Sequence, residues 1–157
     1  MSAVLSATTP RRRASTGSAV EMLRQLSIGL TADLHGYAAL RELLERQFYA
    51  ALSHDAEAIN ALSAAILAQA AELDAQRARR RELLVALLGR AARPDLRTLI
   101  AKLPAATGEP LLALRRALDQ ALSECKALNL RNAQLITEQQ ALMQQLLGRE
   151  EHVYEQR

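Results

Sequence analysis

Residues 111–146 read LLALRRALDQALSECKALNLRNAQLITEQQALMQQL and decide the fold. Apolar or small side chains return every three or four residues through this stretch, which is typical of one helix face and of a heptad seam. The seam comprises Leu111, Leu114, Leu118, Ala121, Cys125, Leu128, Asn132, Leu135, Gln139, Leu142 and Leu146. A second row flanks it at seven-residue intervals, namely Leu122, Asn129, Ile136 and Met143. This wide face suits contact with two neighbours, or with one neighbour and a partner.

Two more helical patterns precede this stretch. Apolar residues recur at helical spacing from about Val20 to Leu52, where Ser53-His54-Asp55 interrupts them. Asp55 suits the N-cap of a second helix, and Gly89 suits the position after its last turn. A short amphipathic helix follows at 95–103 and ends at Pro104, while residues 107–110 have loop chemistry. The sequence therefore predicts an all-α fold, an elongated antiparallel bundle of three long helices with one short crossover helix.

The composition agrees with this fold class. Half of the 157 residues are apolar, a quarter are charged and only 3% are aromatic, and β-branched residues are too few for a sheet. Residues 1–18 lack apolar periodicity and are expected to form a disordered N-terminal arm. Residues 19–148 form the predicted helical bundle domain, and Gly148 is the expected end of the last helix. Residues 149–157 are expected to be a flexible C-terminal tail.

Residues that could support catalysis are few. His54 and Glu57 occur once and in the reverse order of a metal-binding Glu-x-x-His pair, so helix capping is the better interpretation. Cys125 lies on the seam, where a free thiol behaves as a small buried hydrophobe. We therefore expect no enzyme, no cofactor and no metal. A single cysteine indicates a reducing compartment, and no apolar run approaches the ~20 residues that span a bilayer. We expect a cytoplasmic protein without membrane insertion.

The net charge of +3 and the pI near 9.5 come mainly from two arginine clusters. These are Arg11, Arg12 and Arg13, and then Arg77, Arg79, Arg80 and Arg81. No aromatic side chain accompanies them as a stacking platform, so nucleic acid is not a favoured partner. The second cluster is interpreted as a solvated stretch of helix, with a specific anion site as the alternative.

Asn129, Asn132 and Gln139 stand on the broad face where an optimised core would have leucine. A buried unpaired amide costs roughly 1 to 3 kcal/mol, so each needs a partner. Two interpretations stay open: buried amides that fix the helix register, or a face that stays soluble when empty and hydrogen-bonds a visiting helix.

Residues 128–136, read as LNLRNAQLI and followed by Gln139 and Gln140, resemble the Leu-Asn-x-x-Asn-Gly-x-Leu-Ile stretch of FlgN-type flagellar export chaperones. The resemblance extends over about 20–154 and includes the His-Asp-Ala-Glu-Ala-Ile start at 54–59. Ala133 departs from the family's usual glycine. The chain also stops at Arg157, where relatives commonly continue.

This resemblance implies a cytoplasmic chaperone of flagellar type III export. Such a protein holds the terminal amphipathic helices of hook-filament junction, or hook-associated, proteins and delivers them to the flagellar export apparatus. The client-binding residues expected on the last helix are Asn129, Asn132, Leu135, Ile136, Gln139, Leu142, Met143 and Leu146. Tyr154 is a candidate for docking to the export apparatus, and the client-free protein is a candidate homo-oligomer. The alternative function is a generic helical adaptor or self-associating coiled-coil scaffold.

Overall fold

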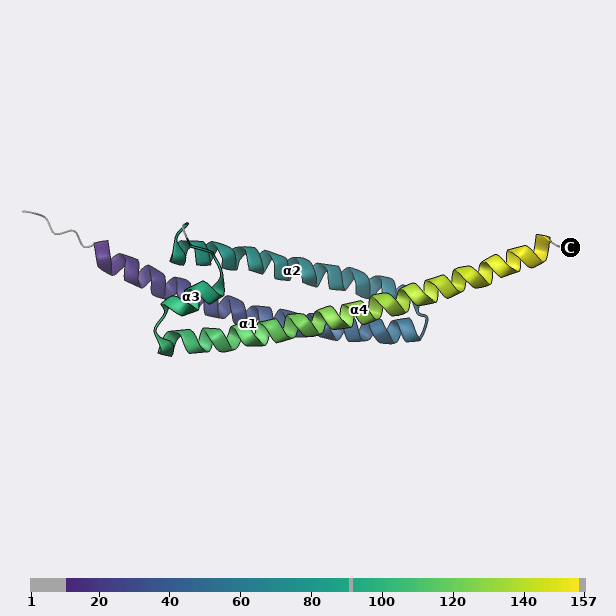
Figure 1. Cartoon of the computed structure of the whole chain (residues 1–157), viewed down its shortest axis with the longest axis horizontal. Helices are drawn as coiled ribbons and strands as arrows, with labels where there is room; N and C mark the ends of the chain where they lie inside the picture. The colour runs from purple at the N-terminus through teal and green to yellow at the C-terminus, as the bar shows by residue number, and fades with distance from the viewer. Residues whose placement is uncertain (1–10, 91, 156–157) are drawn as a thin grey trace, which may run out of the picture. The chain divides into compact units, whose positions relative to one another are not determined.

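The computed structural model describes residues 11–90 and 92–155, of which 11–16, 151, 153 and 154 are described by their backbone alone. Four helices account for nearly all of this range (Figure 1). They are α1 (Arg11–Leu52), α2 (Ala56–Leu88), α3 (Leu96–Lys102) and α4 (Ala105–Glu155). No strand occurs in the described ranges. The predicted all-α class, with three long helices and one short one, is confirmed.

The connection between α1 and α2 follows the predicted chemistry. Asp55 Oδ1 accepts a hydrogen bond from the Ala58 amide at 3.0 Å, which caps the first turn of α2. His54, just before the cap, has a φ of 53°, a left-handed conformation that is uncommon outside glycine. Gly89 follows the last turn of α2 with a φ of 81°, and its amide donates to the Val85 carbonyl at 2.8 Å. Asp55 and Gly89 thus begin and end α2 as predicted.

The start of α4 differs from the prediction of a loop at 107–110. The Pro104 carbonyl accepts the amides of Thr107 at 3.0 Å and Gly108 at 2.8 Å, so the helix begins directly after this proline. Pro110 lies inside the helix, close enough to its start that few backbone bonds are lost. Gly108 is buried, and a Cβ there would lie 3.4 Å from the Ile100 carbonyl oxygen. Close packing against α3 therefore favours helix where the local sequence favours a loop.

The outer ends of α1 and α4 also differ from the sequence pattern. α1 already begins at Arg11, before the first apolar residue of its face, and α4 continues through Gly148 to Glu155. The expected helix end at Gly148 was therefore wrong. One exposed glycine costs up to ~1 kcal/mol relative to alanine, which a long helix tolerates. Residues 1–10 of the predicted arm, and 156–157 of the predicted tail, lie outside the described residues.

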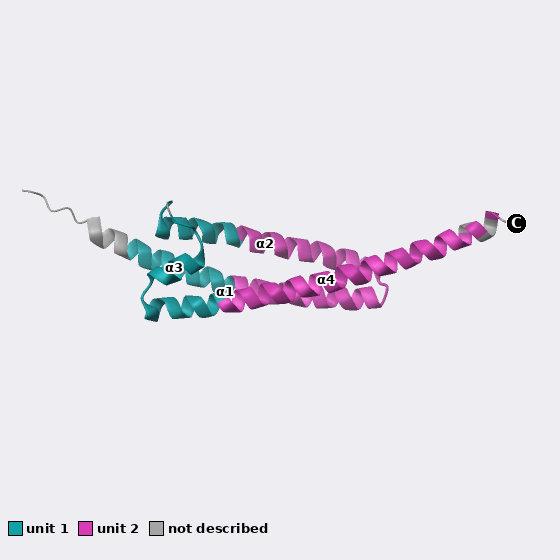
Figure 2. Ribbon diagram, in the orientation of Figure 1, with its two compact units in different colours: residues 1–32, 76–115 teal, residues 33–75, 116–157 magenta. Residues whose placement is uncertain are grey.

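The chain divides into two units, each with its own core (Figure 2). Unit 1 combines residues 1–32 and 76–115, and unit 2 combines residues 33–75 and 116–157. The buried apolar residues of unit 1 are Leu26, Leu30, Leu84, Leu99 and Leu111. Those of unit 2 are Leu44, Ala51, Leu62, Leu73 and Cys125. Unit 2 contains every residue predicted to bind a client.

Candidate functional site

Three side chains of α4 donate hydrogen bonds to three backbone carbonyls of α1 within unit 2. The pairs are Cys125 with Tyr37 at 3.5 Å, Asn132 with Leu44 at 2.7 Å, and Gln139 with Ala51 at 2.9 Å. Partners in each pair are 88 residues apart, and successive pairs are seven residues apart on both helices. The two helices therefore run parallel in a heptad register. We call these three contacts the carbonyl ladder.

α2 runs antiparallel to α1 in the same unit. The Gln47 side chain donates to Ser63 Oγ at 3.0 Å, and Gln69 donates to the Gly36 carbonyl at 3.1 Å, so residue numbers rise along one helix and fall along the other. The approach at Gly36 is close, because a Cβ there would lie 2.8 Å from Leu73 Cδ2. Unit 2 is thus an up-down-up arrangement of α1, α2 and α4 segments.

A chain of buried and partly buried hydrogen bonds joins all three helices. Arg131 Nε donates to Asn132 Oδ1 at 3.2 Å, and Asn132 Nδ2 donates to Gln47 Oε1 at 3.0 Å as well as to the α1 backbone. Gln47 passes the chain to Ser63, whose hydroxyl donates to the Ile59 carbonyl at 2.7 Å. Asn132 is 1% exposed and Gln47 is 8% exposed. Because every amide group of Asn132 is paired, this residue fixes the register of α4 on α1.

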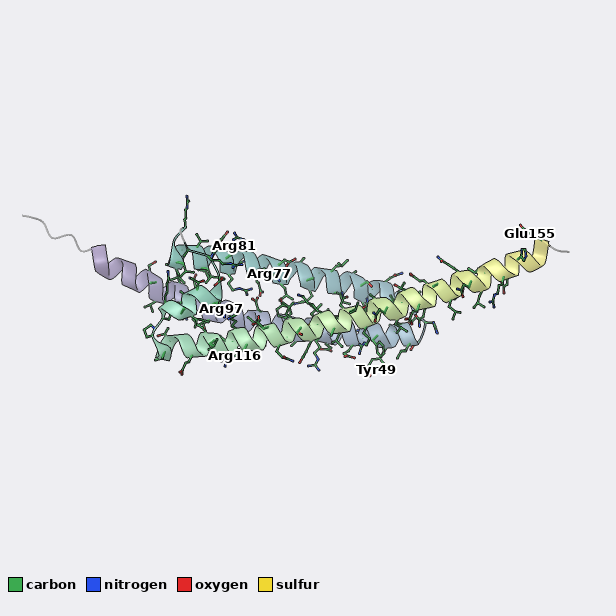
Figure 3. All side chains as sticks on the ribbon, viewed as in Figure 1. Tyr49, Arg77, Arg81, Arg97, Arg116 and Glu155 are labelled. Atoms are coloured by element: carbon green, nitrogen blue, oxygen red, sulfur yellow. The ribbon has the colours of Figure 1, made fainter. Side chains whose placement is uncertain are left out.

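Arg131 adds a second, more exposed tie between the same two helices. Its guanidinium carbon lies 3.7 Å from the centroid of the Phe48 ring, and Nη2 lies 3.4 Å from Glu45 Oε2. Both charged side chains are about one third exposed, so the ion pair is partly screened by water. The neighbouring Tyr49 ring meets Phe48 edge-on at 5.8 Å and is itself exposed (Figure 3). This packing fixes α4 near its midpoint.

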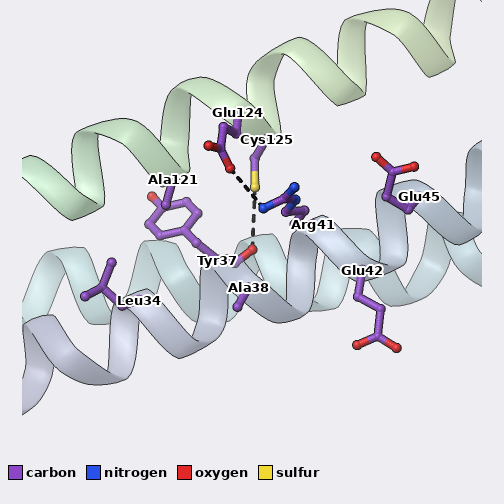
Figure 4. Close-up of a pocket in the computed structure, with 9 residues that line it drawn as sticks. All are labelled: Leu34, Tyr37, Ala38, Arg41, Glu42, Glu45, Ala121, Glu124 and Cys125. Carbon is purple, nitrogen blue, oxygen red and sulfur yellow. Dashed lines mark hydrogen bonds and ion pairs between the residues drawn. The ribbon is translucent and has the colours of Figure 1, made fainter.

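Cys125 occupies the first step of the carbonyl ladder (Figure 4). A shallow groove beside it is lined by Leu34, Ala38 and Ala121, and an ion pair between Arg41 and Glu124 at 3.3 Å borders it. Burial raises the pKa of the Cys125 thiol, and the Glu124 carboxylate acts in the same direction. A raised pKa lowers the thiolate fraction near neutral pH, which is the opposite of what a nucleophilic cysteine needs.

α4 extends beyond the end of α1, the helix that it pairs with in unit 2. With the 88-residue offset, Leu52 at the end of α1 lies level with Gln140, whereas α4 runs on to Glu155. These further 15 residues correspond to about 22 Å of helix. Residues 141–150 are all exposed, and the large apolar side chains among them are Leu142, Met143, Leu146 and Leu147, each about half exposed. We call Leu142, Met143, Leu146 and Leu147 the apolar overhang.

A groove opens where the overhang leaves the other two helices. His54, Ala56 and Ile59, from the α1–α2 turn and the first turn of α2, line one side. The α4 side comprises Ile136, Gln139, Gln140, Leu142, Met143 and Leu146. We call this feature the terminal groove. Most of its wall is apolar and no Lys, Arg, Asp or Glu side chain lines it, so it suits an uncharged face of a helix.

The eight residues predicted to bind a client fall into different environments. Ile136, Gln139, Leu142, Met143 and Leu146 meet in the terminal groove, and Leu135 is half-buried. Asn129 is exposed and does not line the groove. Asn132 is buried in the hydrogen-bond chain, which favours the register interpretation of that amide. Gln139 belongs to both the carbonyl ladder and the terminal groove, because its amide donates the last hydrogen bond of the ladder and its side chain lines the groove. The side chain of Tyr154 lies outside the described residues.

Sequence reasoning missed the other wall of the groove. His54, Ala56 and Ile59 were interpreted only as the start of the second helix, although the interruption at Ser53-His54-Asp55 marks where α1 ends beside α4. Leu147 was also missed, since it lies outside both rows of the heptad pattern.

α4 thus combines a hydrogen-bonded ladder to α1 with an exposed apolar end. A family model, described as FlgN protein, matches residues 22–148, which cover most of the chain and the whole of the 128–136 motif. The chain belongs to the FlgN family. FlgN proteins are chaperones of flagellum biogenesis, so the family resemblance seen in the sequence is confirmed. Comparisons with curated proteins and with solved structures gave no match.

Two further findings concern the described residues of this FlgN-family chain. None of their helices is long and apolar enough to cross a membrane. Within the same residues, no group of three or more His, Cys, Asp or Glu side chains is placed to hold a metal ion.

Proposed function

We propose that this chain is a cytoplasmic export chaperone that masks a terminal amphipathic helix of a hook-associated flagellar protein and delivers it to the export apparatus. The observation that supports the masking step is the apolar overhang, where α4 continues beyond α1 with half-exposed leucines and methionine. Family membership supports the flagellar export setting. Handover to the export apparatus, a cytoplasmic location and a docking role for Tyr154 rest on the family resemblance.

The terminal groove supports helix-in-groove binding as the mechanism. An incoming amphipathic helix would lay its apolar face against Ile136, Leu142, Met143 and Leu146, with Ile59 closing the other side. Each of the four overhang side chains is about half exposed, so covering them contributes about 1 kcal/mol each, or about 4 kcal/mol in total. Part of this is offset by the ordering of the client helix. The resulting complex is reversible, as a handover requires.

A matched pair of substitutions on α4 tests the site. Leu142 and Leu130 are 58% and 59% exposed, but only Leu142 lines the terminal groove. Leu142→Asp places a charge in the apolar groove and should weaken binding of a hook-associated terminal-helix peptide at least tenfold in a calorimetric titration. Leu130→Asp should change the Kd less than twofold. Equal affinities for the two variants, or loss of binding in both, would refute the assignment of the groove.

The scaffold alternative predicts a different response to the peptide. A scaffold uses its apolar helix face to self-associate permanently, whereas a chaperone exchanges any such contact for its client. Sedimentation of the full chain, with and without saturating peptide, should therefore show that any oligomer formed by the free chain dissociates or rearranges when peptide is bound. An oligomer that persists unchanged and excludes the peptide would favour the scaffold.

A further inference from the structure

Positive charge is concentrated in one part of the chain. Residues 76–115 of unit 1 contain nine Lys and Arg residues against three Asp and Glu residues, a net charge of +6. Unit 2 contains seven basic and thirteen acidic residues, a net charge of −6. The overall charge of +3 conceals this separation. A local excess of this size sets up an attractive field for anionic partners of unit 1.

Four exposed arginines lie within seventeen consecutive residues of unit 1. They are Arg81 near the end of α2, Arg90 and Arg93 in the connection, and Arg97 on α3. We call them the arginine patch; Figure 3 labels Arg81 and Arg97 on their helices. Arg93 pairs with Asp95 at 3.5 Å yet stays 87% exposed. Asp95 in turn caps α3, because its Oδ1 accepts the Thr98 amide at 2.7 Å. The carboxylate of Asp95 therefore has a structural role as the N-cap of α3.

The side chains of the patch suit phosphate. Eight of the nine basic residues in 76–115 are arginine, whose planar guanidinium can donate two parallel hydrogen bonds to one phosphate group. Single-stranded nucleic acid would also need aromatic stacking platforms, and the sequence of unit 1 contains no Phe, Tyr or Trp. An anionic phospholipid surface needs only clustered cations, each contributing about 1 kcal/mol near the surface.

A second copy of the chain is a weaker candidate, although unit 2 is acidic. Its carboxylates are spread over three helices and are partly used within the unit, since Glu45 pairs with Arg131 and Glu124 pairs with Arg41. A bilayer presents closely spaced phosphates on a continuous surface.

We infer that the arginine patch of unit 1 docks the protein onto the surface of an anionic phospholipid membrane, separately from the terminal groove of unit 2. Contact is electrostatic and peripheral. Lipid phosphates pair with the guanidinium groups of the patch, and no segment enters the hydrocarbon. The attraction falls with ionic strength, because the patch is exposed and its charges are screened.

Co-sedimentation of the full chain with vesicles tests this inference. Vesicles of phosphatidylcholine with 40% phosphatidylglycerol should bind the protein at low salt, and pure phosphatidylcholine vesicles should not. The variant with Arg81→Gln, Arg90→Gln and Arg97→Gln removes one arginine from each segment of the patch. All three side chains are exposed, so the fold should be unaffected. Its partition coefficient should fall on the order of 100-fold.

The matched control removes the same net charge from exposed residues of unit 2, with Arg46→Gln, Lys126→Gln and Arg149→Gln. This variant should keep binding within about threefold of the parent. Equal losses in the two variants would overturn the inference, because binding would then follow net charge and not the patch. Tighter binding to single-stranded or duplex DNA than to vesicles at the same salt would also overturn it, as would displacement by millimolar inorganic phosphate at constant ionic strength.

Discussion

Asn132→Ala is the substitution that most directly tests how unit 2 is held in register. It removes the donors to the Leu44 carbonyl and to Gln47 Oε1, and the acceptor for Arg131 Nε. Arg131 is partly exposed and can bond to water instead, but Gln47 is 8% exposed and its oxygen would be left buried without a donor. That penalty is about 1 to 3 kcal/mol. With the small cavity left by the side chain, we expect a loss of about 2 to 3 kcal/mol in unfolding free energy.

Asn129→Ala is the matched control, because this asparagine is on the same helix and exposed. Its unfolding free energy should change by no more than about 0.5 kcal/mol. Urea unfolding followed by circular dichroism at 222 nm measures both variants. A double-mutant cycle with Gln47→Ala should give a coupling energy of about 1 kcal/mol or more, since the two amides share a hydrogen bond. If Asn132→Ala and Asn129→Ala cost the same, the buried hydrogen-bond chain does not determine the register.

Three further outcomes can be measured with the same protein. Gly36→Ala should lower the unfolding free energy by about 1 to 2 kcal/mol, because a Cβ there would come within 2.8 Å of the buried Leu73 side chain. Gly29→Ala is the control: it has open space around it and should raise the unfolding free energy by up to about 1 kcal/mol. Leu118→Asp, at a half-buried seam position, should lower the unfolding free energy by at least about 2 kcal/mol, and the exposed Leu142→Asp should lower it by less than about 1 kcal/mol. If urea melts give the reverse order, α4 is not divided into a core part and an overhang. Cys125 should react with a thiol reagent at pH 8 far more slowly in the folded protein than in urea, because burial raises its pKa, and equal rates would show that the thiol is accessible.

The helices themselves were predictable because their signals are local. Three- and four-residue spacing, the Asp55 cap and the glycine after α2 act within one or two turns, and the structure confirms each of them. The error at the start of α4 has a different origin. Residues 107–110 have local loop chemistry, but Gly108 packs against Ile100 of α3, and a contact between separate elements outweighs the local preference.

The candidate site was only partly predictable, because its arrangement depends on the pairing of α4 with α1. Asn129 and Asn132 look equivalent on the broad apolar face, yet one is exposed and the other is 1% exposed. The 88-residue offset between α1 and α4 decides which of the two asparagines faces α1. This offset depends on how two helices far apart in the sequence pair, so no local sequence pattern reveals it. The turn between α1 and α2 likewise brings Ile59 into the same groove as Met143, which periodicity within one helix cannot predict.

The seam of α4 changes chemistry at the point where α1 ends. At seven-residue intervals it presents Cys125, Asn132 and Gln139, and each donates a hydrogen bond to an α1 carbonyl. The next position in the series is Leu146, and its counterpart 88 residues earlier is Ala58, which already belongs to α2. Three successive positions of this series thus donate to the C-terminal half of α1, and the next position carries an apolar side chain where α1 has ended. Because a leucine gains stability only by burial against other apolar groups, this switch favours an incoming amphipathic helix as the occupant of the overhang.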